Sequence, residues 1–282
     1  MAYSKEILKK YLENKGNKDW IAYSGEGAYR TFQFELVLRA INRYLPPEDS
    51  LVLDVGIDPG NFAYKIAQNK RRIVIGDISE EQLKFIREKF NVNNLSAKID
   101  QYAILEELYD LSIFKDESFD LVLCLSGTIS YTCEHRNKMI SEICRVTKAG
   151  APMIISLRTK ASYFKSLIKK QDIDLLENAA KEGLWEFIDT GYKPYNDRLE
   201  EPAFYGFEFK EISSFLDYAN CEILEIFSLN PITSEQISSL TNIRENEDAW
   251  NNLLAIEEKF SKNTGLLEAS EEIIIIARKR IA

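Results

Sequence analysis

Short apolar segments alternate with segments of helical spacing along most of the chain, and this alternation constrains the fold more than any other feature. Seven segments have the length and composition of strands: residues 50–55, 72–77, 102–106, 119–125, 151–157, 221–227 and 271–279. Strands that alternate with helices need crossover connections, which produce a parallel sheet covered on both faces. The pattern therefore predicts an α/β fold with a doubly wound, mostly parallel, seven-stranded sheet.

We interpret the chain as a single domain, residues 1–282, with four regions. These are N-terminal helices and a flap in 1–47, a core in 48–158, an inserted helical cap in 159–208, and the completion of the sheet in 209–282. Aromatic residues are frequent in the inserted region. We expect two or three of them to line a substrate pocket and the others to hold the cap together. They are Tyr163, Phe164, Trp185, Phe187, Tyr192, Tyr195, Phe204, Tyr205 and Phe207.

Composition excludes several classes of function. The formal net charge of −9 disfavours nucleic acid as a partner. Four cysteines without C-x-x-C spacing and one histidine predict no metal site, and they are typical of a reducing, cytoplasmic protein. No segment approaches the roughly 20 apolar residues of a membrane span. The sequence gives no indication of oligomeric state.

A glycine-containing turn follows the first strand, in the segment LDVGIDPGNFA. Gly56 and Gly60 allow a tight turn and a close approach of a ligand to the backbone. The next helix begins there, and its N-terminus favours negative charge on a ligand. Ligands of doubly wound sheets bind at this end of the strands. The turn is a candidate binding loop, although many such loops only change the direction of the chain.

A second carboxylate stands at the end of the second strand. Asp77 lies 17 residues after Gly60, and a carboxylate at this place can accept hydrogen bonds from the two ribose hydroxyls of an adenosine ligand. The alternative is a structural aspartate beside Ser79, which we expect to cap the next helix.

Four motifs in order carry a resemblance to a known family. The segments LDVGIDPG, GDIS, SFDLVLCL and RVTKAGAPMIIS resemble the motifs of the class I S-adenosylmethionine-dependent methyltransferases. The resemblance covers residues 30–160 and continues more loosely to LLEASEEIIIIARK, which is similar to the closing strand of a small-molecule branch. It implies a Rossmann-like methyltransferase fold, S-adenosylmethionine as cofactor, and methyl transfer to the oxygen, nitrogen or carbon of a small molecule.

The resemblance assigns cofactor-binding roles to individual positions. Asp54, Gly56 and Gly60 match the cofactor loop, Asp77 the ribose-binding acid, and Ile78 a residue that packs on the adenine. Glu107 and the backbone of Leu108 fall where the family holds the adenine edge, with Asp100 as an alternative to Glu107. Leu125 and Ser126 match the strand end beside the methionine moiety.

Two positions depart from the family pattern. Ala149 and Ala151 replace a proline and a glycine in a turn, which we interpret as a structural change. Asp58 replaces the middle glycine of the cofactor loop. Its carboxylate can pair with the ammonium group of the cofactor, repel the cofactor carboxylate, or point to solvent.

No catalytic base is evident from the sequence. Methyl transfer requires an acceptor close to the methyl group and in line with it, and a base only when the acceptor loses a proton. Tyr131 and His135 are weak candidates for that role. Arg30, in the glycine-containing flap around Tyr23 and Tyr29, can pair with the cofactor carboxylate.

Two other functions remain open from sequence alone. A nicotinamide-dependent oxidoreductase shares the alternating pattern and the strand-end acid, but Gly56 to Asn61 does not supply G-x-G-x-x-G. A catalytically inactive methyltransferase-like binding protein is the other alternative, with Asp58 as the disabling change.

Overall fold

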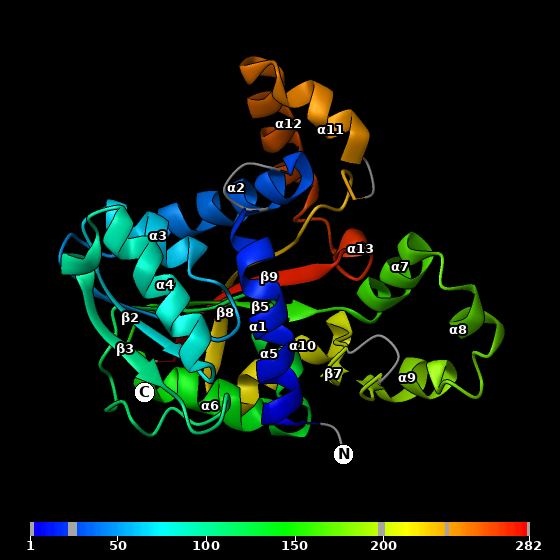
Figure 1. Ribbon diagram of the computed structural model, residues 1–282, viewed down its shortest axis with the longest axis horizontal. Helices are drawn as coiled ribbons and strands as arrows, with labels where there is room; N and C mark the ends of the chain where they lie inside the picture. Colours follow the sequence, from blue (N-terminus) through cyan, green and yellow to red (C-terminus); the bar gives the residue numbers. More distant parts are fainter. Residues whose placement is uncertain (1–2, 22–26, 197–200, 235–236, 281–282) are drawn as a thin grey trace.

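The fold was analysed in a computed structural model that describes residues 3–21, 27–196, 201–234 and 237–280 (Figure 1). Seven strands form the central sheet. In their spatial order they are β3 (Ile99–Ile104), β2 (Arg72–Asp77), β1 (Leu51–Val55), β4 (Leu121–Cys124), β5 (Pro152–Arg158), β9 (Glu272–Lys279) and β8 (Cys221–Ser228). The first five pair in parallel, and β9 runs antiparallel to both of its neighbours. The predicted mostly parallel, doubly wound sheet is confirmed.

Helices cover both faces of the sheet, because alternate residues of each buried strand point to opposite sides. In β9, Ile274 and Ile276 belong to one apolar core, whereas Ile273 and Ile275 belong to the other. The first core is covered by α2 (Ala28–Arg43), α3 (Asn61–Gln68), α4 (Glu80–Val92), α11 (Ile237–Arg244) and α12 (Glu247–Phe260). The second is covered by α5 (Thr128–Tyr131), α6 (Arg136–Val146), α10 (Phe209–Tyr218) and α13 (Thr264–Leu267).

Residues 159–196 and 201–208 lie to one side of the sheet, at the right of Figure 1. They contain α7 (Lys160–Lys170), α8 (Ile173–Glu177) and α9 (Leu184–Thr190). The expected helical insertion also contains a short antiparallel ladder, in which β6 (Tyr192–Lys193) pairs with β7 (Phe204–Tyr205). Most of the aromatic residues here are buried or half-buried in the second core, whereas Trp185 is 62% exposed.

Helix α1 (Lys5–Ile21) crosses the carboxyl ends of the central strands, in front of the sheet in Figure 1. Helical spacing in the sequence is evident only over residues 5–13, so this helix extends beyond the segment that the pattern indicates. Of the expected flap, residues 22–26, including Tyr23, lie outside the described residues, and Tyr29 and Arg30 belong to α2.

Two other boundaries differ from the prediction. Strand β3 begins at Ile99, earlier than expected, because its first residues are polar and partly exposed at the sheet edge. The polar sequence over about 234–262 has the spacing of one helical segment, but the structure has two helices, α11 and α12, of which the second begins after Asn246. The Asn246 side chain accepts a hydrogen bond from the Ala249 backbone N–H and so caps α12. Within the described part of the chain, no helix has both the length and the apolar character needed to cross a bilayer.

Candidate functional site

The loop after β1 is shaped by close contacts of its glycine backbone. Gly56 has a φ of 131°, and a Cβ atom there would lie 2.2 Å from the Thr128 Oγ1 atom. Thr128 in turn accepts a hydrogen bond of 3.1 Å from the Ile57 backbone N–H, which ties the loop to α5. A side chain at position 56 would therefore separate the loop after β1 from the end of β4.

Asp58 lies inside this loop and is only 6% exposed, so the alternative that it points to solvent is wrong. Its Oδ1 atom accepts 2.9 Å hydrogen bonds from the backbone N–H groups of Gly60 and Asn61, at the start of α3. Its Oδ2 atom accepts a bond of 3.2 Å from the Ser126 hydroxyl. The sequence predicted that the N-terminus of α3 could bind an anionic group of a ligand. In the structure, the Asp58 carboxylate already occupies this position.

A second acid adjoins Asp58. Asp54, in β1, is buried, and its Oδ2 atom has no hydrogen-bond partner in the described structure. Burial raises the pKa of Asp54 well above its ordinary value, and the nearby Asp58 raises it further, whereas the Ala63 backbone N–H lowers it. Two adjacent buried acids favour a cationic ligand group.

Asp77 ends β2 and is 1% exposed. Its Oδ1 atom accepts a hydrogen bond of 2.7 Å from the Ser79 backbone N–H, and its Oδ2 atom has no partner in the described structure. Burial raises the pKa of this carboxyl to about 8, against the opposing backbone hydrogen bonds. Ser79 caps α4 as expected, through a 3.2 Å bond to the Gln82 backbone N–H. Asp77 therefore has both a structural contact and an acceptor atom available to a ligand.

The loop after β3 contains Glu107 and Leu108. Glu107 has a buried Oε2 atom without a hydrogen-bond partner among the described residues. The Leu108 backbone N–H donates to the Tyr3 hydroxyl, at the start of the chain, over 3.2 Å. Asp100, the alternative to Glu107, lies in the first half of β3 and forms an ion pair with Arg72. The structure places Glu107, not Asp100, at the same edge of the sheet as Asp77.

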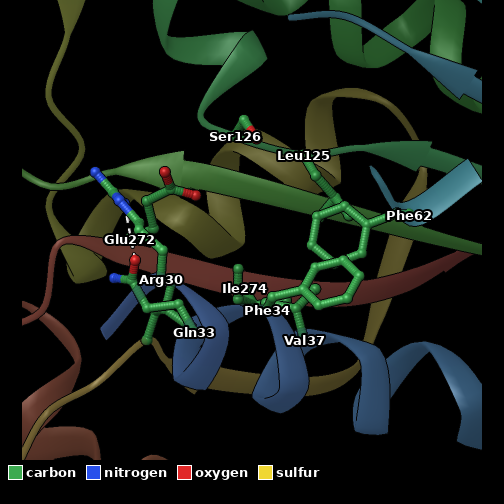
Figure 2. Close-up of a pocket in the computed structure, with 10 residues that line it drawn as sticks. Arg30, Gln33, Phe34, Val37, Phe62, Leu125, Ser126, Glu272 and Ile274 are labelled. Atoms are coloured by element: carbon green, nitrogen blue, oxygen red, sulfur yellow. Dashed lines mark hydrogen bonds between the residues drawn. The ribbon is translucent and has the colours of Figure 1, made fainter. Parts of the chain in front are cut away.

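A pocket with about 330 Å³ of empty space, part of it open to solvent, adjoins Ser126 at the end of β4 (Figure 2). Arg30 extends into it from α2 and donates a 2.8 Å hydrogen bond to the Gln33 side chain. Phe34 and Phe62, whose ring centroids are 4.8 Å apart, form one wall. The pocket therefore combines a guanidinium with an apolar wall beside the loop that contains Asp58.

Helix α1 and Tyr3, which precedes it, contact the segments that follow three strands. Glu13 accepts a hydrogen bond of 2.9 Å from the Ser79 hydroxyl, two residues after Asp77. Tyr3 bonds Leu108, and the Tyr11 ring lies 6.3 Å from the ring of Tyr131. These contacts join residues far apart in the chain, so no sequence motif indicated that α1 covers this edge of the sheet.

The other predicted residues lie in different surroundings. Ile78 is buried in the second core, and Leu125 is buried at the end of β4. Tyr131 is buried and accepts a 2.8 Å hydrogen bond from Arg158 at the end of β5. His135 stacks on Tyr109, with ring centroids 4.0 Å apart, and its Nε2 atom lies 3.9 Å from a Glu134 carboxylate oxygen.

No motif in the sequence indicated Arg158 as part of the site. A Cβ atom on Gly127 would lie 2.6 Å from the Arg158 Cγ atom, so the arginine side chain passes directly over the turn that follows Ser126. The only sequence signal was a basic residue directly after an apolar strand. Groups of acids, cysteines and histidine able to hold a metal are absent from the described residues.

Comparison with known proteins identifies the family. A family model described as "Methyltransferase domain" matches residues 52–150. An uncharacterized protein of Methanocaldococcus jannaschii is 32% identical over 163 residues, which cover 55% of this chain and 70% of the relative.

Two solved structures share the fold. An S-adenosylmethionine-dependent methyltransferase from Methanosarcina mazei has 20% identity and a TM-score of 0.55, over 86% of this chain and 98% of that one. Geranyl diphosphate C-methyltransferase from Streptomyces coelicolor A3(2), solved with S-adenosyl-L-homocysteine, Mg²⁺ and geranyl diphosphate, has 12% identity and a TM-score of 0.54, over 87% and 79%. The solved structures show the same fold, and the methyltransferase-domain model together with the four motifs places the chain in the class I S-adenosylmethionine-dependent methyltransferases.

Proposed function

We propose that this methyltransferase transfers its methyl group to a small molecule held between α1, α5 and the inserted region 159–208. The observation that carries the proposal is a set of three buried carboxylate oxygens without hydrogen-bond partners in the described structure. They belong to Asp54 in β1, Asp77 at the end of β2 and Glu107 after β3, and these three strands are neighbours in the sheet. Buried acceptors without donors cost free energy, so their presence together supports a ligand that supplies donors.

S-adenosylmethionine carries matching donors. The Asp77 Oδ2 atom would accept from the ribose hydroxyls, and Glu107 from the adenine amino group, with Ile78 and Leu108 beside the ring. Asp54 and Asp58 would attract the ammonium group, and Arg30 would pair with the carboxylate near Ser126. Gly56 and Gly60 would keep the loop backbone close to the ligand.

When bound, the cofactor supplies a methyl group activated by a sulfonium. The protein then has to orient the acceptor and exclude water. The acceptor would lie in a space that α1 and Tyr131 border. A general base is required only for an acceptor that loses a proton. Tyr131 borders this space, whereas His135 is engaged with Tyr109 and Glu134, so Tyr131 is the stronger candidate.

The division of the chain into 1–47, 48–158, 159–208 and 209–282 is part of the same proposal, with 159–208 as the substrate cap. The acidic charge supports a small-molecule partner rather than nucleic acid. The four free, buried cysteines support a reducing compartment such as the cytoplasm.

Ligand-dependent thermal stability tests the proposal. S-adenosylmethionine or S-adenosylhomocysteine at 100 times its dissociation constant should add about 2.7 kcal/mol to the free energy of unfolding, and NAD should add none. Asp77→Ala should abolish the response, and the matched control His135→Ala should retain it. A response to NAD alone would favour an oxidoreductase, and no response to any of the three would favour an inactive relative.

A further inference from the structure

A cavity on the inserted side of the sheet is separate from the pocket at Arg30. It encloses about 650 Å³ of empty space, part of it open to solvent. Ile7 and Leu8 of α1, Tyr131 of α5, and Tyr195, Pro202 and Ala203 of the inserted region line it. The lining is mainly apolar and aromatic, as in sites that bind small molecules.

Ser4, Tyr131 and Tyr195 contribute hydroxyl-bearing side chains to the described lining of this cavity, and Arg158, which is not one of those lining residues, contacts the hydroxyl of Tyr131. The Arg158 Nη1 atom donates to that hydroxyl over 2.8 Å, and the guanidinium carbon lies 4.0 Å from the centroid of the Phe204 ring. No carboxylate oxygen in the described ranges lies within 4.0 Å of the guanidinium nitrogens. Arg158 is thus a half-buried cation held by aromatic groups instead of an acid.

A second cation lies in the same aromatic cluster. Lys193 is 4% exposed, with its Nζ atom 5.1 Å from the centroid of the Tyr163 ring. Its amine donates to the Pro194 carbonyl over 3.2 Å, and no described acid forms an ion pair with it. Rings of Tyr163 and Phe204, 5.8 Å apart, connect Lys193 with the surroundings of Arg158.

Acids near these cations offset only part of their charge. Glu201 forms an ion pair of 2.8 Å with Lys170. Glu272 lies beyond ion-pair distance of Arg158, and burial raises its pKa, which favours its neutral form, although Ser156 and Arg158 oppose this. In a chain with 45 acidic and 36 basic residues, acids are not scarce. A buried cation without an acidic partner costs free energy unless a ligand supplies the opposite charge.

Arg158 also lies close to the end of β4, beside the loop where the methyl donor is proposed to bind. Its stem passes over Gly127, and the preceding residue, Ser126, bonds to Asp58 of the loop after β1. An anion beside Arg158 would therefore lie between the cavity and the end of β4.

From this arrangement we infer that the cavity binds a small, largely apolar molecule with one carboxylate, which Arg158 and the Tyr131 hydroxyl hold and Lys193 attracts. The inference rests on the proposed function, because it names the class of the acceptor. One carboxylate can pair with the planar guanidinium of Arg158. The charge of Lys193, which nearby acids offset only in part, adds to the attraction.

Paired probes test the inference on the full chain saturated with S-adenosylhomocysteine. A panel of aryl and alkyl monocarboxylates, each beside its own primary amide and the corresponding phosphate monoester, is titrated by calorimetry. At least one carboxylate should bind about tenfold or more tightly than its amide. Arg158→Gln should reduce that preference to less than about threefold, and Lys193→Met should weaken carboxylate binding with little effect on the amide. Arg158→Lys keeps the positive charge but loses the paired N–H donors of the guanidinium, so its preference for the carboxylate over the amide should be intermediate.

Arg87→Gln is the matched control, because Arg87 also stacks on a tyrosine ring, that of Tyr102, 4.8 Å away on the opposite side of the sheet. It should leave the preference unchanged. Equal binding of carboxylates and amides, tighter binding of the phosphate monoesters, or binding of none of the probes would each overturn the inference. Failure of the wild-type chain to bind S-adenosylhomocysteine would instead count against the proposed function.

Discussion

At the scale of single residues, the Asp58 carboxylate makes two kinds of contact, neither of which the sequence indicated. Asp58 caps α3 through Gly60 and Asn61, and it also faces Ser126 at the end of β4. A glycine at this position, as in the family pattern, would leave both backbone N–H groups without the acceptor they have here. The departure from the pattern is therefore compatible with an intact loop.

Two substitutions separate the cap from the charge of Asp58. Asp58→Gly should lower the free energy of unfolding by about 0.5–2 kcal/mol, since both N–H groups of α3 lose their acceptor. Asp58→Asn keeps an acceptor oxygen, so stability should change little. It should nevertheless weaken S-adenosylhomocysteine binding by about 1.5 kcal/mol, roughly tenfold, because the ammonium group loses a charged partner.

Calorimetry and thermal unfolding of the same samples would measure both effects. The control is Asn246→Ala, which removes the cap of α12 and should cost stability without changing ligand affinity. Wild-type affinity in Asp58→Asn would mean that Asp58 acts only as a cap.

The raised pKa of Asp77 predicts a pH dependence. With a pKa of about 8, the carboxyl holds its proton at neutral pH in the ligand-free protein. Ribose hydroxyls that donate to it would favour the carboxylate, so binding should release a proton. Affinity for S-adenosylhomocysteine should rise from about pH 6 to about pH 8 and then level off. Since the folded-state pKa is raised, stability of the ligand-free chain should fall over the same rise in pH.

Calorimetry at neutral pH in buffers of different ionisation enthalpy counts the released protons. Asp77→Asn should remove this release. The control is Asp54→Asn, which removes the neighbouring acid, whose pKa is also raised, and leaves Asp77 in place. An enthalpy that does not depend on the buffer would contradict the assignment to Asp77.

At the scale of elements, α1 determines how accessible the edge of the sheet is. The hydroxyl of Tyr3, two residues before α1, already accepts a hydrogen bond from the Leu108 N–H that the family pattern assigns to the adenine edge. Glu13 bonds Ser79 beside Asp77. A ligand that uses these groups has to displace the contacts of α1, at least at its first turn.

Tyr3→Phe should therefore speed ligand entry. Loss of one hydrogen bond worth about 0.5–1.5 kcal/mol should raise the association rate constant for S-adenosylhomocysteine by roughly two- to tenfold. Stopped-flow tryptophan fluorescence can follow this, since Trp20 at the end of α1 packs against Tyr64. Tyr44→Phe removes a hydroxyl that bonds Glu225 elsewhere and should leave the rate unchanged. A rate that stays the same or falls in Tyr3→Phe would show that α1 does not limit entry.

At the scale of the whole molecule, the last strand completes a sheet that begins more than 200 residues earlier. β9 lies between β5 and β8, with Ile275 opposite Ile155 on one side and Ile226 on the other. The inserted region separates β5 from β8 and β9 along the chain but not in space. We therefore expect the chain to unfold as one cooperative unit.

Ile275→Ala tests this expectation. The side chain is fully buried, so its truncation should cost about 2–5 kcal/mol in urea unfolding. Circular dichroism and tryptophan fluorescence should shift together. Ile223→Ala, at a position 38% exposed on β8, should cost less than about 1 kcal/mol. Separate transitions by the two probes would contradict a single domain.

Periodicity and motifs predicted most of the sheet and the positions of Asp54, Asp77 and Glu107, because a strand and the turn that follows it are encoded by adjacent residues. The boundaries of β3 and the short β6–β7 ladder were missed, since polar edge residues and two-residue strands leave little pattern. The family resemblance made the cofactor assignment, which spacing alone did not.

By itself, the sequence determined the order of strands and helices, the glycine turn and the acids at the strand ends. Only the tertiary structure decided that α1 crosses those ends, that Asp58 faces inward, and that Arg158 reaches Tyr131 beside the cavity. The reason is physical: apolar periodicity tells each element which face to bury, but not which distant element will cover it. Contacts such as Glu13 with Ser79 depend on how those faces pack, and no local pattern encodes them.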